Sequence, residues 1–282
     1  MPFTTLISTD ALAPHLADLD FVVVDCRFKL DDPTWGEREY ERRHIPGATY
    51  AHLDRDLSGA QTGRNGRHPL PGIEALMATF GRFGIRAGTQ VVAYDQDRGM
   101  FASRLWWLLR WLGHDRVAVL DGGFAKWIAE GRQTSTGIER RAQEHFIGAP
   151  RKEMIVSADE VSTLMSRGGW RLLDARAPER YRGETEPLDR VAGHIPTAAN
   201  HFFQQNLDAH GTFRAAEALR DRLNAAIGET SPEHVICYCG SGVTACHNLL
   251  ALEHAAMPGA KLYPGSWSEW STDQSRPIEK SK

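Results

Sequence analysis

Residues 235–246 read Val-Ile-Cys-Tyr-Cys-Gly-Ser-Gly-Val-Thr-Ala-Cys, and this stretch predicts a strand, a tight turn and a helix. A short apolar run ends at Cys239, a glycine-rich turn follows, and a helical pattern continues to Ala256. The backbone N–H groups of such a turn, and the helix N-terminus behind it, carry partial positive charge. They stabilise a thiolate, and they equally hold an anion or a persulfide. The stretch therefore predicts a reactive Cys239 rather than a cysteine that only fills the core.

An internal repeat extends this pattern to the whole chain. The paired landmarks are 7–10 with 156–159, 25–27 with 174–176, 44–48 with 194–198, 91–95 with 235–239, and 122–124 with 265–267. Landmarks that recur in the same order indicate two copies of one fold. We expect an N-terminal domain at 1–135, a polar linker at 136–153 and a C-terminal domain at 154–282, which suits a chain of 282 residues.

The alternation of apolar runs and helical patterns predicts an α/β fold, with a mainly parallel sheet flanked by helices in each domain. Expected strands are 21–25, 90–94, 117–120, 170–174, 234–238 and 261–263, and expected helices are 73–83, 101–112, 158–166, 215–226 and 245–256. A further helix is expected from a cap at 8–10 to about Leu16. Ligands bind at the carboxyl ends of such strands, which is where Cys239 falls.

Composition excludes several classes of protein. The net charge of −3 gives no reason to expect a nucleic-acid partner. No run of 18 apolar residues predicts a membrane span, and the first 20 residues do not read as a signal peptide. Four cysteines are too few for a disulfide framework, so we expect a reduced, cytoplasmic setting. The spacing of Cys237, Cys239 and Cys246 fits a metal site poorly, and we expect neither a metal nor another cofactor.

The string Cys-Gly-Ser-Gly-Val-Thr after an apolar strand resembles the active-site loop of the rhodanese superfamily of sulfurtransferases, and within it that of the 3-mercaptopyruvate sulfurtransferases. Known two-domain rhodaneses share the asymmetry of this repeat, in which Asp95 stands where the second copy has Cys239. The resemblance implies a catalytic C-terminal domain and an inactive N-terminal partner. It also implies that Cys239 takes sulfur from a small anionic donor and passes it to cyanide, a small thiol or a thioredoxin-like acceptor.

The loop residues bear on the donor. Thiosulfate-specific relatives carry basic residues beside the cysteine, whereas Ser241 here lies between glycines, which favours 3-mercaptopyruvate. By resemblance, Ser241, His68 and Asp54 form a proton relay across the domain interface, with Asp56 as an alternative to Asp54. The backbone N–H groups expected around the sulfur belong to Gly240, Ser241, Gly242, Val243 and Thr244. We also expect the Thr244 hydroxyl to cap the following helix.

Arginines are expected to bind the donor anion, because a guanidinium group binds a carboxylate in bidentate fashion. Arg180 matches the carboxylate-binding arginine of the family. Where animal enzymes have a second arginine, this chain has Pro187, so Arg182 or Arg190 is expected to compensate. Residues that recur in both copies are interpreted as structural; these are Arg27 and Arg176, and His44 and His194.

Three alternatives stay beside this hypothesis. A tyrosine phosphatase of similar fold needs an arginine six residues after the cysteine, and Ala245 stands there. A non-catalytic binding module or sulfur carrier is disfavoured by the retained Cys239 loop. A thiosulfate:cyanide sulfurtransferase remains the alternative within the same class.

Overall fold

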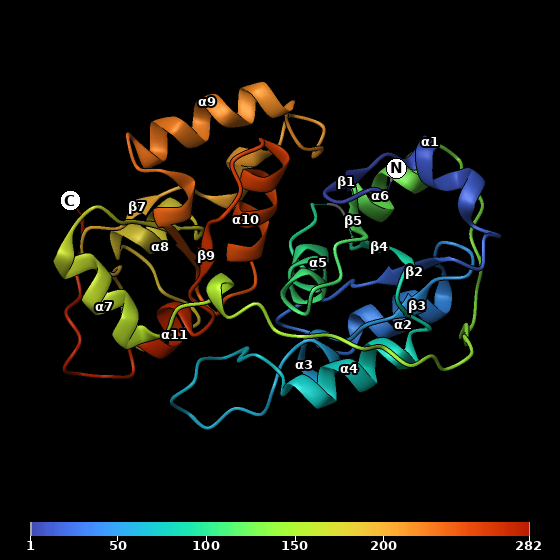
Figure 1. Cartoon of the computed structure of the whole chain (residues 1–282), viewed down its shortest axis with the longest axis horizontal. Coiled ribbons are helices and arrows are strands. Elements are labelled where there is room, and N and C mark those ends of the chain that lie inside the picture. The colour runs from blue at the N-terminus through green and yellow to red at the C-terminus, as the bar shows by residue number, and fades with distance from the viewer. Residues whose placement is uncertain (1, 97, 282) are drawn as a thin grey trace. The chain divides into compact units, whose positions relative to one another are not determined.

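The computed structural model describes residues 2–96 and 98–281, which form two compact units (Figure 1). The first unit comprises Met1–Gly59, Pro71–Arg151 and Ala209–Thr212, and the second comprises Ala60–Leu70, Lys152–Asp208 and Phe213–Lys282. Residues 60–70 thus pack with the second unit, although they lie within the first sequence repeat. Most of the segment expected as a linker is extended chain of the first unit, where Glu144 N donates to Gly81 O at 2.9 Å and Ala149 N donates to Leu112 O at 3.0 Å.

The first unit is built on a five-stranded sheet in which every neighbouring pair is parallel, in the order β1-β5-β4-β2-β3. Its strands are β1 (Leu6–Ile7), β2 (Phe21–Asp25), β3 (Thr49–Tyr50), β4 (Gln90–Tyr94) and β5 (Val117–Leu120). Its helices are α1 (Thr9–Leu12), η1 (Ala13–His15), α2 (Trp35–Arg42), α3 (Leu53–Asp56), α4 (Ile73–Arg82), α5 (Ala102–Trp111) and α6 (Gly123–Ala129). Helix α5 packs on β4 and β5.

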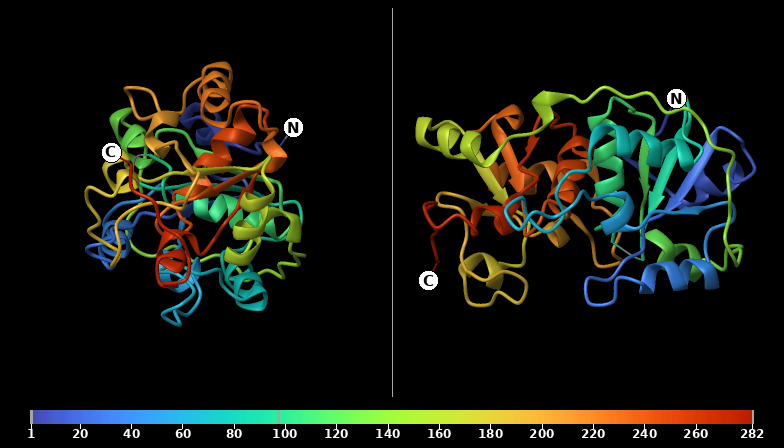
Figure 2. Two further views of the ribbon diagram at one scale, coloured as in Figure 1. Left: turned by 90° about the vertical axis from the view of Figure 1, so that its left-hand side faces the viewer. Right: turned by 90° about the horizontal axis from the view of Figure 1, so that it is seen from below.

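The second unit repeats this plan with a four-stranded parallel sheet in the order β7-β6-β8-β9. Its strands are β6 (Arg171–Asp174), β7 (Ala199–Asn200), β8 (Val235–Tyr238) and β9 (Lys261–Leu262). Its helices are η2 (Lys152–Met154), α7 (Ala158–Arg167), α8 (Pro178–Arg182), η3 (Phe203–Asn206), α9 (Ala216–Ile227), η4 (Pro232–His234), α10 (Ala245–His254) and α11 (Ser266–Trp270). Figures 1 and 2 show α9 and α10 together on one side of this sheet, and α7 and α11 pack together.

The central strands are buried on both faces because helices cover each sheet on both sides. All four residues of β8 and all five residues of β4 are buried. Such strands read as continuous apolar runs rather than as alternating patterns. This explains why the sequence located them well: the expected strands at 21–25, 90–94 and 117–120 have the observed bounds. The predicted α/β class, with a parallel sheet in each of two repeats, is confirmed.

The N-terminal helix is shorter than expected. It begins after Ser8, whose side chain accepts from the N–H of Ala11, but it ends at Leu12 instead of Leu16. Pro14 lies in the 3₁₀ turn η1 that follows. Proline has no N–H group to continue the i to i−4 hydrogen bonds, so an α-helix through this position loses a bond. In the described ranges, no helix is long and apolar enough to cross a membrane.

Strand register in the second unit sets the position of the site. Asp174 at the end of β6 pairs with Tyr238 at the end of β8. The segments that begin at Ala175 and Cys239 therefore leave the same edge of the sheet side by side, and Ala175 N donates to Tyr238 O at 2.9 Å. This edge carries the carboxyl ends of the strands, where parallel sheets place their ligands.

Candidate active site

Cys239 lies between β8 and α10, where its sulfur meets the turn that follows it. The N–H of Gly242 donates to Sγ of Cys239, with 3.1 Å between the two atoms. The Cys239 N–H donates to Oγ of Ser266 at 3.1 Å, and that hydroxyl donates to the carbonyl of Tyr263 at 2.9 Å. The side chain is only 2% exposed. The thiol is therefore held in one orientation, against a backbone donor that can stabilise negative charge on sulfur.

Glycine at position 242 is required by geometry. Gly242 has φ +79°, and a Cβ there would collide with the carbonyl oxygen of Pro264. Most side chains avoid this left-handed region, and the close approach of the two backbones leaves no room for a methyl group. The turn can therefore aim the Gly242 N–H at the sulfur only with glycine in this place.

The expectation that the Thr244 hydroxyl caps α10 is wrong. Thr244 is the N-cap residue, but it has helical angles, φ −71° and ψ −14°, and its side chain makes no capping bond. A capping side chain needs extended backbone at the N-cap to reach the N–H two or three residues ahead. Here the chain enters α10 through tight turns, with Cys246 N donating to Val243 O and His247 N donating to Thr244 O.

His68 and Ser241 meet beside the cysteine turn. Nδ1 of His68 lies 2.7 Å from Oγ of Ser241, and both residues are buried. Both belong to the second unit, because His68 lies in the segment Ala60–Leu70 that packs there. The bond runs in either direction depending on the imidazole tautomer, so the pair can hold or move a proton.

The backbone of segment 60–70 is fixed by contacts within itself and with the rest of the second unit. Gln61 Nε2 donates to Arg67 O at 2.7 Å, and Arg67 N donates to Oγ of Ser268 at 3.0 Å. Gly66 has φ +82°, and a Cβ there would lie 2.7 Å from the carbonyl oxygen of Gly265. This close packing places His68 at the turn of Cys239.

Asp54, the third expected member of the relay, belongs to the first unit. It is exposed, near the start of the short helix α3, and its N–H donates to Nδ1 of His52 at 3.1 Å. Asp56 accepts from the N–H of His52 at 2.8 Å and forms an ion pair with Arg82. The relay residues that the second unit brings together are Ser241 and His68.

Two arginines lie against the turn at Gly240. A Cβ built on Gly240 would stand 2.9 Å from an Nη atom of Arg67, and 3.4 and 3.5 Å from the two Nη atoms of Arg180. The absence of a side chain at Gly240 thus leaves room for both guanidinium groups. Arg180 was expected near the site from the sequence, and Arg67 was not. Two adjacent guanidinium groups form a site suited to a small anion.

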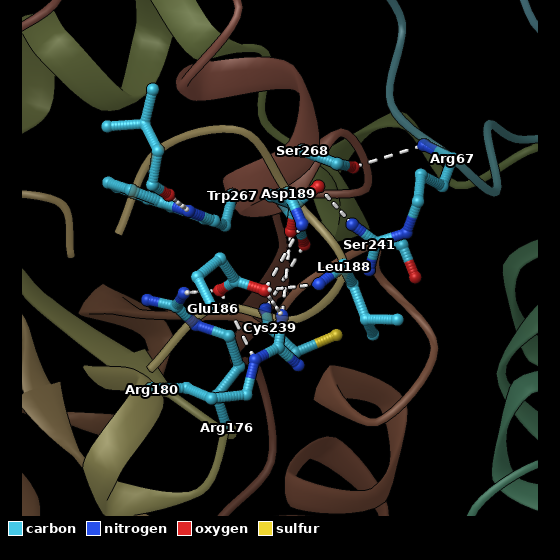
Figure 3. Close-up of polar contacts among 12 residues, drawn as sticks. Arg67, Arg176, Arg180, Glu186, Leu188, Asp189, Cys239, Ser241, Trp267 and Ser268 are labelled. Atoms are coloured by element: carbon cyan, nitrogen blue, oxygen red, sulfur yellow. Dashed lines mark hydrogen bonds and ion pairs between the residues drawn. The ribbon is translucent and has the colours of Figure 1, made fainter. Parts of the chain in front are cut away.

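The arginines near the turn are already paired with acidic side chains (Figure 3). Arg180 forms an ion pair with Glu186 at 2.6 Å and lies 3.5 Å from Asp189. Arg67 forms an ion pair with Asp189. Both carboxylates are largely buried, and neither was expected at the site from the sequence.

The two arginines expected to compensate for Pro187 lie differently. Arg182 bonds to Glu184 through Nε at 2.6 Å, in an exposed pair at the end of α8. Arg190 is an exposed residue of the segment after α8. Arg67, by contrast, has its guanidinium group at Gly240.

Residues that recur in both repeats hold the sheet edge together. Arg176 forms an ion pair with Asp174 at 2.6 Å, and Arg27 does the same with Asp25 at 2.6 Å. The charge of Asp174 helps to raise the pKa of Arg176 although burial opposes it, so the group stays protonated. Nδ1 of His194 lies 2.8 Å from Tyr181 O.

His44 makes the matching contact in the first repeat, with Nδ1 2.7 Å from Tyr40 O. These backbone contacts agree with a structural role for the repeated histidines.

The first unit carries the same kind of turn, but its own aspartate fills it. The carboxylate of Asp95 accepts from the N–H groups of Gly99 at 2.9 Å, Phe101 at 2.7 Å and Ala102 at 3.1 Å. Three N–H groups that converge on one anion show that this fold builds an anion cradle after its central strand. In the first unit a side chain that cannot carry sulfur occupies the cradle.

The other cysteines are in different surroundings. Cys26, Cys237 and Cys246 are buried, and none of the chain's cysteines is in a disulfide. Burial raises the pKa of the Cys237 and Cys26 thiols, which keeps them protonated and unreactive. Over residues 2–96 and 98–281, no group of three or more His, Cys, Asp or Glu side chains is arranged to hold a metal.

Arg67 and Ser266 were not expected at the site, although a feature of the sequence points to each of them. Arg67 directly precedes His68. Ser266 aligns with Gly123 in the repeat, and both have left-handed backbone, with φ 55° and 57°. A serine kept where its copy has the better-suited glycine indicates a role for the hydroxyl, which here binds the Cys239 N–H.

Comparison with known proteins agrees with this description. The model of the rhodanese-like domain matches the chain twice, over residues 8–130 and 157–273. A probable 3-mercaptopyruvate sulfurtransferase from Pseudomonas aeruginosa is 45% identical over 280 residues, which cover 99% of each chain. A putative thiosulfate sulfurtransferase, SseB, from Mycobacterium tuberculosis is 39% identical over 267 residues, covering 91% of this chain and 89% of the relative.

A solved structure is similar over nearly the whole chain. SseA from Escherichia coli, described as a 3-mercaptopyruvate sulfotransferase, superposes with a TM-score of 0.79 at 31% identity, covering 94% of this chain and 99% of SseA.

Proposed function

The chain belongs to the family of rhodanese-like domains, as its sequence predicted, and we propose that it is a sulfurtransferase that moves sulfur from 3-mercaptopyruvate through a persulfide on Cys239. One observation carries the proposal: equivalent turns hold Asp95 in the first unit and Cys239 in the second, and only the second can accept a sulfur atom. The names of the Pseudomonas aeruginosa relative and of SseA support this donor.

The first half-reaction begins with the Cys239 thiolate. It attacks the sulfur of the donor, an S–S bond forms, and the C–S bond breaks with its electron pair going to carbon. The products are a Cys239 persulfide and the enolate of pyruvate, which takes one proton to become pyruvate. The Gly242 N–H already contacts Sγ, and we assign the N–H groups of Val243 and Thr244 to the outer sulfur.

The proton for the enolate comes from Ser241 and His68. Their 2.7 Å contact, in a buried position beside the turn, supports this role. The resemblance supports Asp54, an exposed residue of the first unit, as the third member, with Asp56 as the alternative. A donor whose leaving group needs no proton, such as thiosulfate, does not require this pair.

The donor carboxylate binds to Arg180 and Arg67. Both guanidinium groups lie at Gly240, one residue from the nucleophile, which supports this assignment. Arg182 has less support as a donor ligand because Glu184 already pairs with it, and Arg190 has none beyond its position in the chain.

In the second half-reaction a thiol, a thioredoxin-like protein or cyanide removes the outer sulfur. Attack on the outer sulfur breaks the S–S bond and returns its electron pair to Sγ of Cys239, so no cofactor is required. The mechanism needs the Cys239 thiol outside any disulfide, and we assign the protein to the reducing cytoplasm. We assign catalysis to the C-terminal domain at 154–282, to which segment 60–70 adds His68, and we treat the rest of the N-terminal domain at 1–135 as the inactive partner.

The second candidate is a thiosulfate sulfurtransferase, which the name of the Mycobacterium tuberculosis relative favours. Comparison of kcat/KM for 3-mercaptopyruvate and thiosulfate, with cyanide as the common acceptor, decides between the two. The proposal predicts that 3-mercaptopyruvate is the better donor by about ten-fold or more. A higher kcat/KM for thiosulfate would reverse the assignment of donor, and failure with both donors would refute the sulfurtransferase function.

A further inference from the structure

The buried carboxylate of Asp189 contacts the two arginines to which we assign the donor. Asp189 forms an ion pair with Arg67, and its Oδ2 atom lies 3.5 Å from Nη2 of Arg180. These are the two arginines whose guanidinium groups lie at Gly240. The side chain of Asp189 is 6% exposed, so a carboxylate of the protein already lies in the anion site beside Cys239.

Asp189 is held less completely than its neighbour Glu186. Glu186 forms ion pairs with Arg176 at 3.2 Å and Arg180 at 2.6 Å, and its Oε1 accepts from the N–H groups of Leu188 and Asp189 at 3.1 and 3.2 Å. Oδ2 of Asp189, by contrast, is buried and has no hydrogen-bond donor among the residues that the structure describes. A buried acceptor without a donor is unfavourable, so this contact is the easier of the two to give up.

The charges at the site are balanced before any donor enters. Three arginines (Arg67, Arg176 and Arg180) face three carboxylates (Asp174, Glu186 and Asp189). An anionic donor therefore meets no net positive charge from this cluster unless one of its carboxylates withdraws. Asp174 and Glu186 each bind Arg176 and backbone N–H groups, which leaves Asp189 as the one that can leave at lowest cost.

The chain around Asp189 permits such a movement. Upstream, the segment is fixed by the Glu186 carboxylate, and downstream, Trp267 Nε1 donates to Val191 O at 2.9 Å. Between these anchors Leu188 is 43% exposed, and Pro187 and Arg190 are exposed as well. Asp189 thus lies in a short surface segment that is anchored at Glu186, to which its own N–H donates at 3.2 Å, and at Val191.

We propose that Asp189 is a resident carboxylate that competes with the donor for Arg67 and Arg180, and so sets the affinity of the enzyme for its anionic donor. The inference rests on the proposed function, because it takes these arginines as the donor site. When the donor carboxylate binds, Asp189 releases the two guanidinium groups and its side chain moves toward solvent, which loosens the bonds that the N–H groups of Leu188 and Asp189 donate to Glu186.

The test is the full-length variant Asp189→Asn, which keeps the shape of the side chain and removes its charge. Loss of the competing charge lowers KM for 3-mercaptopyruvate, and the Kd of pyruvate measured by calorimetry, by about ten-fold or more. Asp189→Ser provides a second variant, and circular dichroism verifies that both are folded. The matched control is Glu184→Gln, which removes a nearby carboxylate that pairs with Arg182 instead.

Unchanged or higher KM and Kd values in both Asp189 variants overturn the inference, because they mean that Asp189 is neutral or positions the arginines. Equal changes in Glu184→Gln also overturn it, because they reduce the effect to overall charge. Hydrogen exchange of the N–H groups of residues 188–190 gives a second measurement and is expected to accelerate when pyruvate binds; no change contradicts the displacement. Pyruvate binding is measured without turnover, so it tests the role of Asp189 by itself. If the proposed function is wrong, the wild-type protein forms no persulfide, which is a separate result.

Discussion

Replacement of Ser241 by alanine tests whether the pair with His68 delivers the proton that one donor needs and the other does not. The hydroxyl lies 2.7 Å from Nδ1 of His68 in a buried site. Pyruvate enolate must be protonated, whereas sulfite leaves thiosulfate with its electron pair and needs no proton. General acid catalysis contributes about 10²–10⁴-fold, so we expect kcat/KM for 3-mercaptopyruvate to fall by about 100-fold. For thiosulfate we expect a fall of less than about three-fold.

The effect on folding is expected to be much smaller than the effect on catalysis. Loss of one hydrogen bond costs about 1 kcal/mol of unfolding free energy, whereas a 100-fold loss of rate corresponds to about 2.7 kcal/mol of transition-state stabilisation. The variant therefore stays folded, and urea denaturation measures the first quantity separately from the second.

The assay measures initial rates with both donors on one preparation of each variant, with cyanide as acceptor. His68→Gln and the double variant complete the set. If the two residues act as a unit, the double variant loses no more kcat/KM than the more impaired of the two single variants. Equal losses for the two donors, or additive losses in the double variant, would refute the relay.

Three further predictions concern the turn and the core. Gly242→Ala forces alanine to adopt φ +79° and places its methyl group against the carbonyl oxygen of Pro264. We therefore expect the free energy of unfolding to fall by about 1–3 kcal/mol and calorimetry to show a lower Tm; an unchanged Tm would contradict the geometry. Ser266→Gly relieves the strain at φ 55° and should melt higher than Ser266→Ala, while persulfide formation is slower than wild type in both; equal melting points would remove the strain argument. Burial lowers the pKa of His201, so the unfolded chain binds a proton there more readily than the folded chain does. The free energy of unfolding is therefore highest above about pH 6.5 and decreases as the pH falls. The urea midpoint should therefore drop between about pH 7.5 and pH 5.5, and by less in His201→Gln; an equal drop would assign the effect to other groups.

The sequence predicted the central strands well and the short peripheral ones poorly. Strands such as β2 and β4 are buried on both faces and carry long apolar runs. Strands β1, β3 and β7 have two residues each, too few for any periodic pattern to show. Their pairing is a consequence of tertiary structure.

In the candidate site, too, the residues of a local motif could be predicted from the sequence, whereas contacts between distant residues could not. Cys239, Ser241 and Gly242 lie in one continuous motif, and its local geometry follows from glycine and the strand–turn–helix pattern. The resemblance pointed to Arg180 and His68. The contacts of Arg67 with Asp189 and Ser268 join positions more than 100 residues apart, and no local pattern encodes them. A threonine before a helix favours a cap, but the turn behind Thr244 gives its backbone helical angles, from which the hydroxyl makes no capping bond.

The proposed function requires that the second unit carries the transferred sulfur on Cys239 and that the first unit carries none. Brief exposure of the wild-type protein to 3-mercaptopyruvate without acceptor, followed by alkylation and peptide mass spectrometry, tests this directly. We expect one additional sulfur atom per chain, on the peptide that contains Cys239, and none in Cys239→Ser. Sulfur on Cys26, Cys237 or Cys246, or persulfide formation that survives in Cys239→Ser, would contradict it.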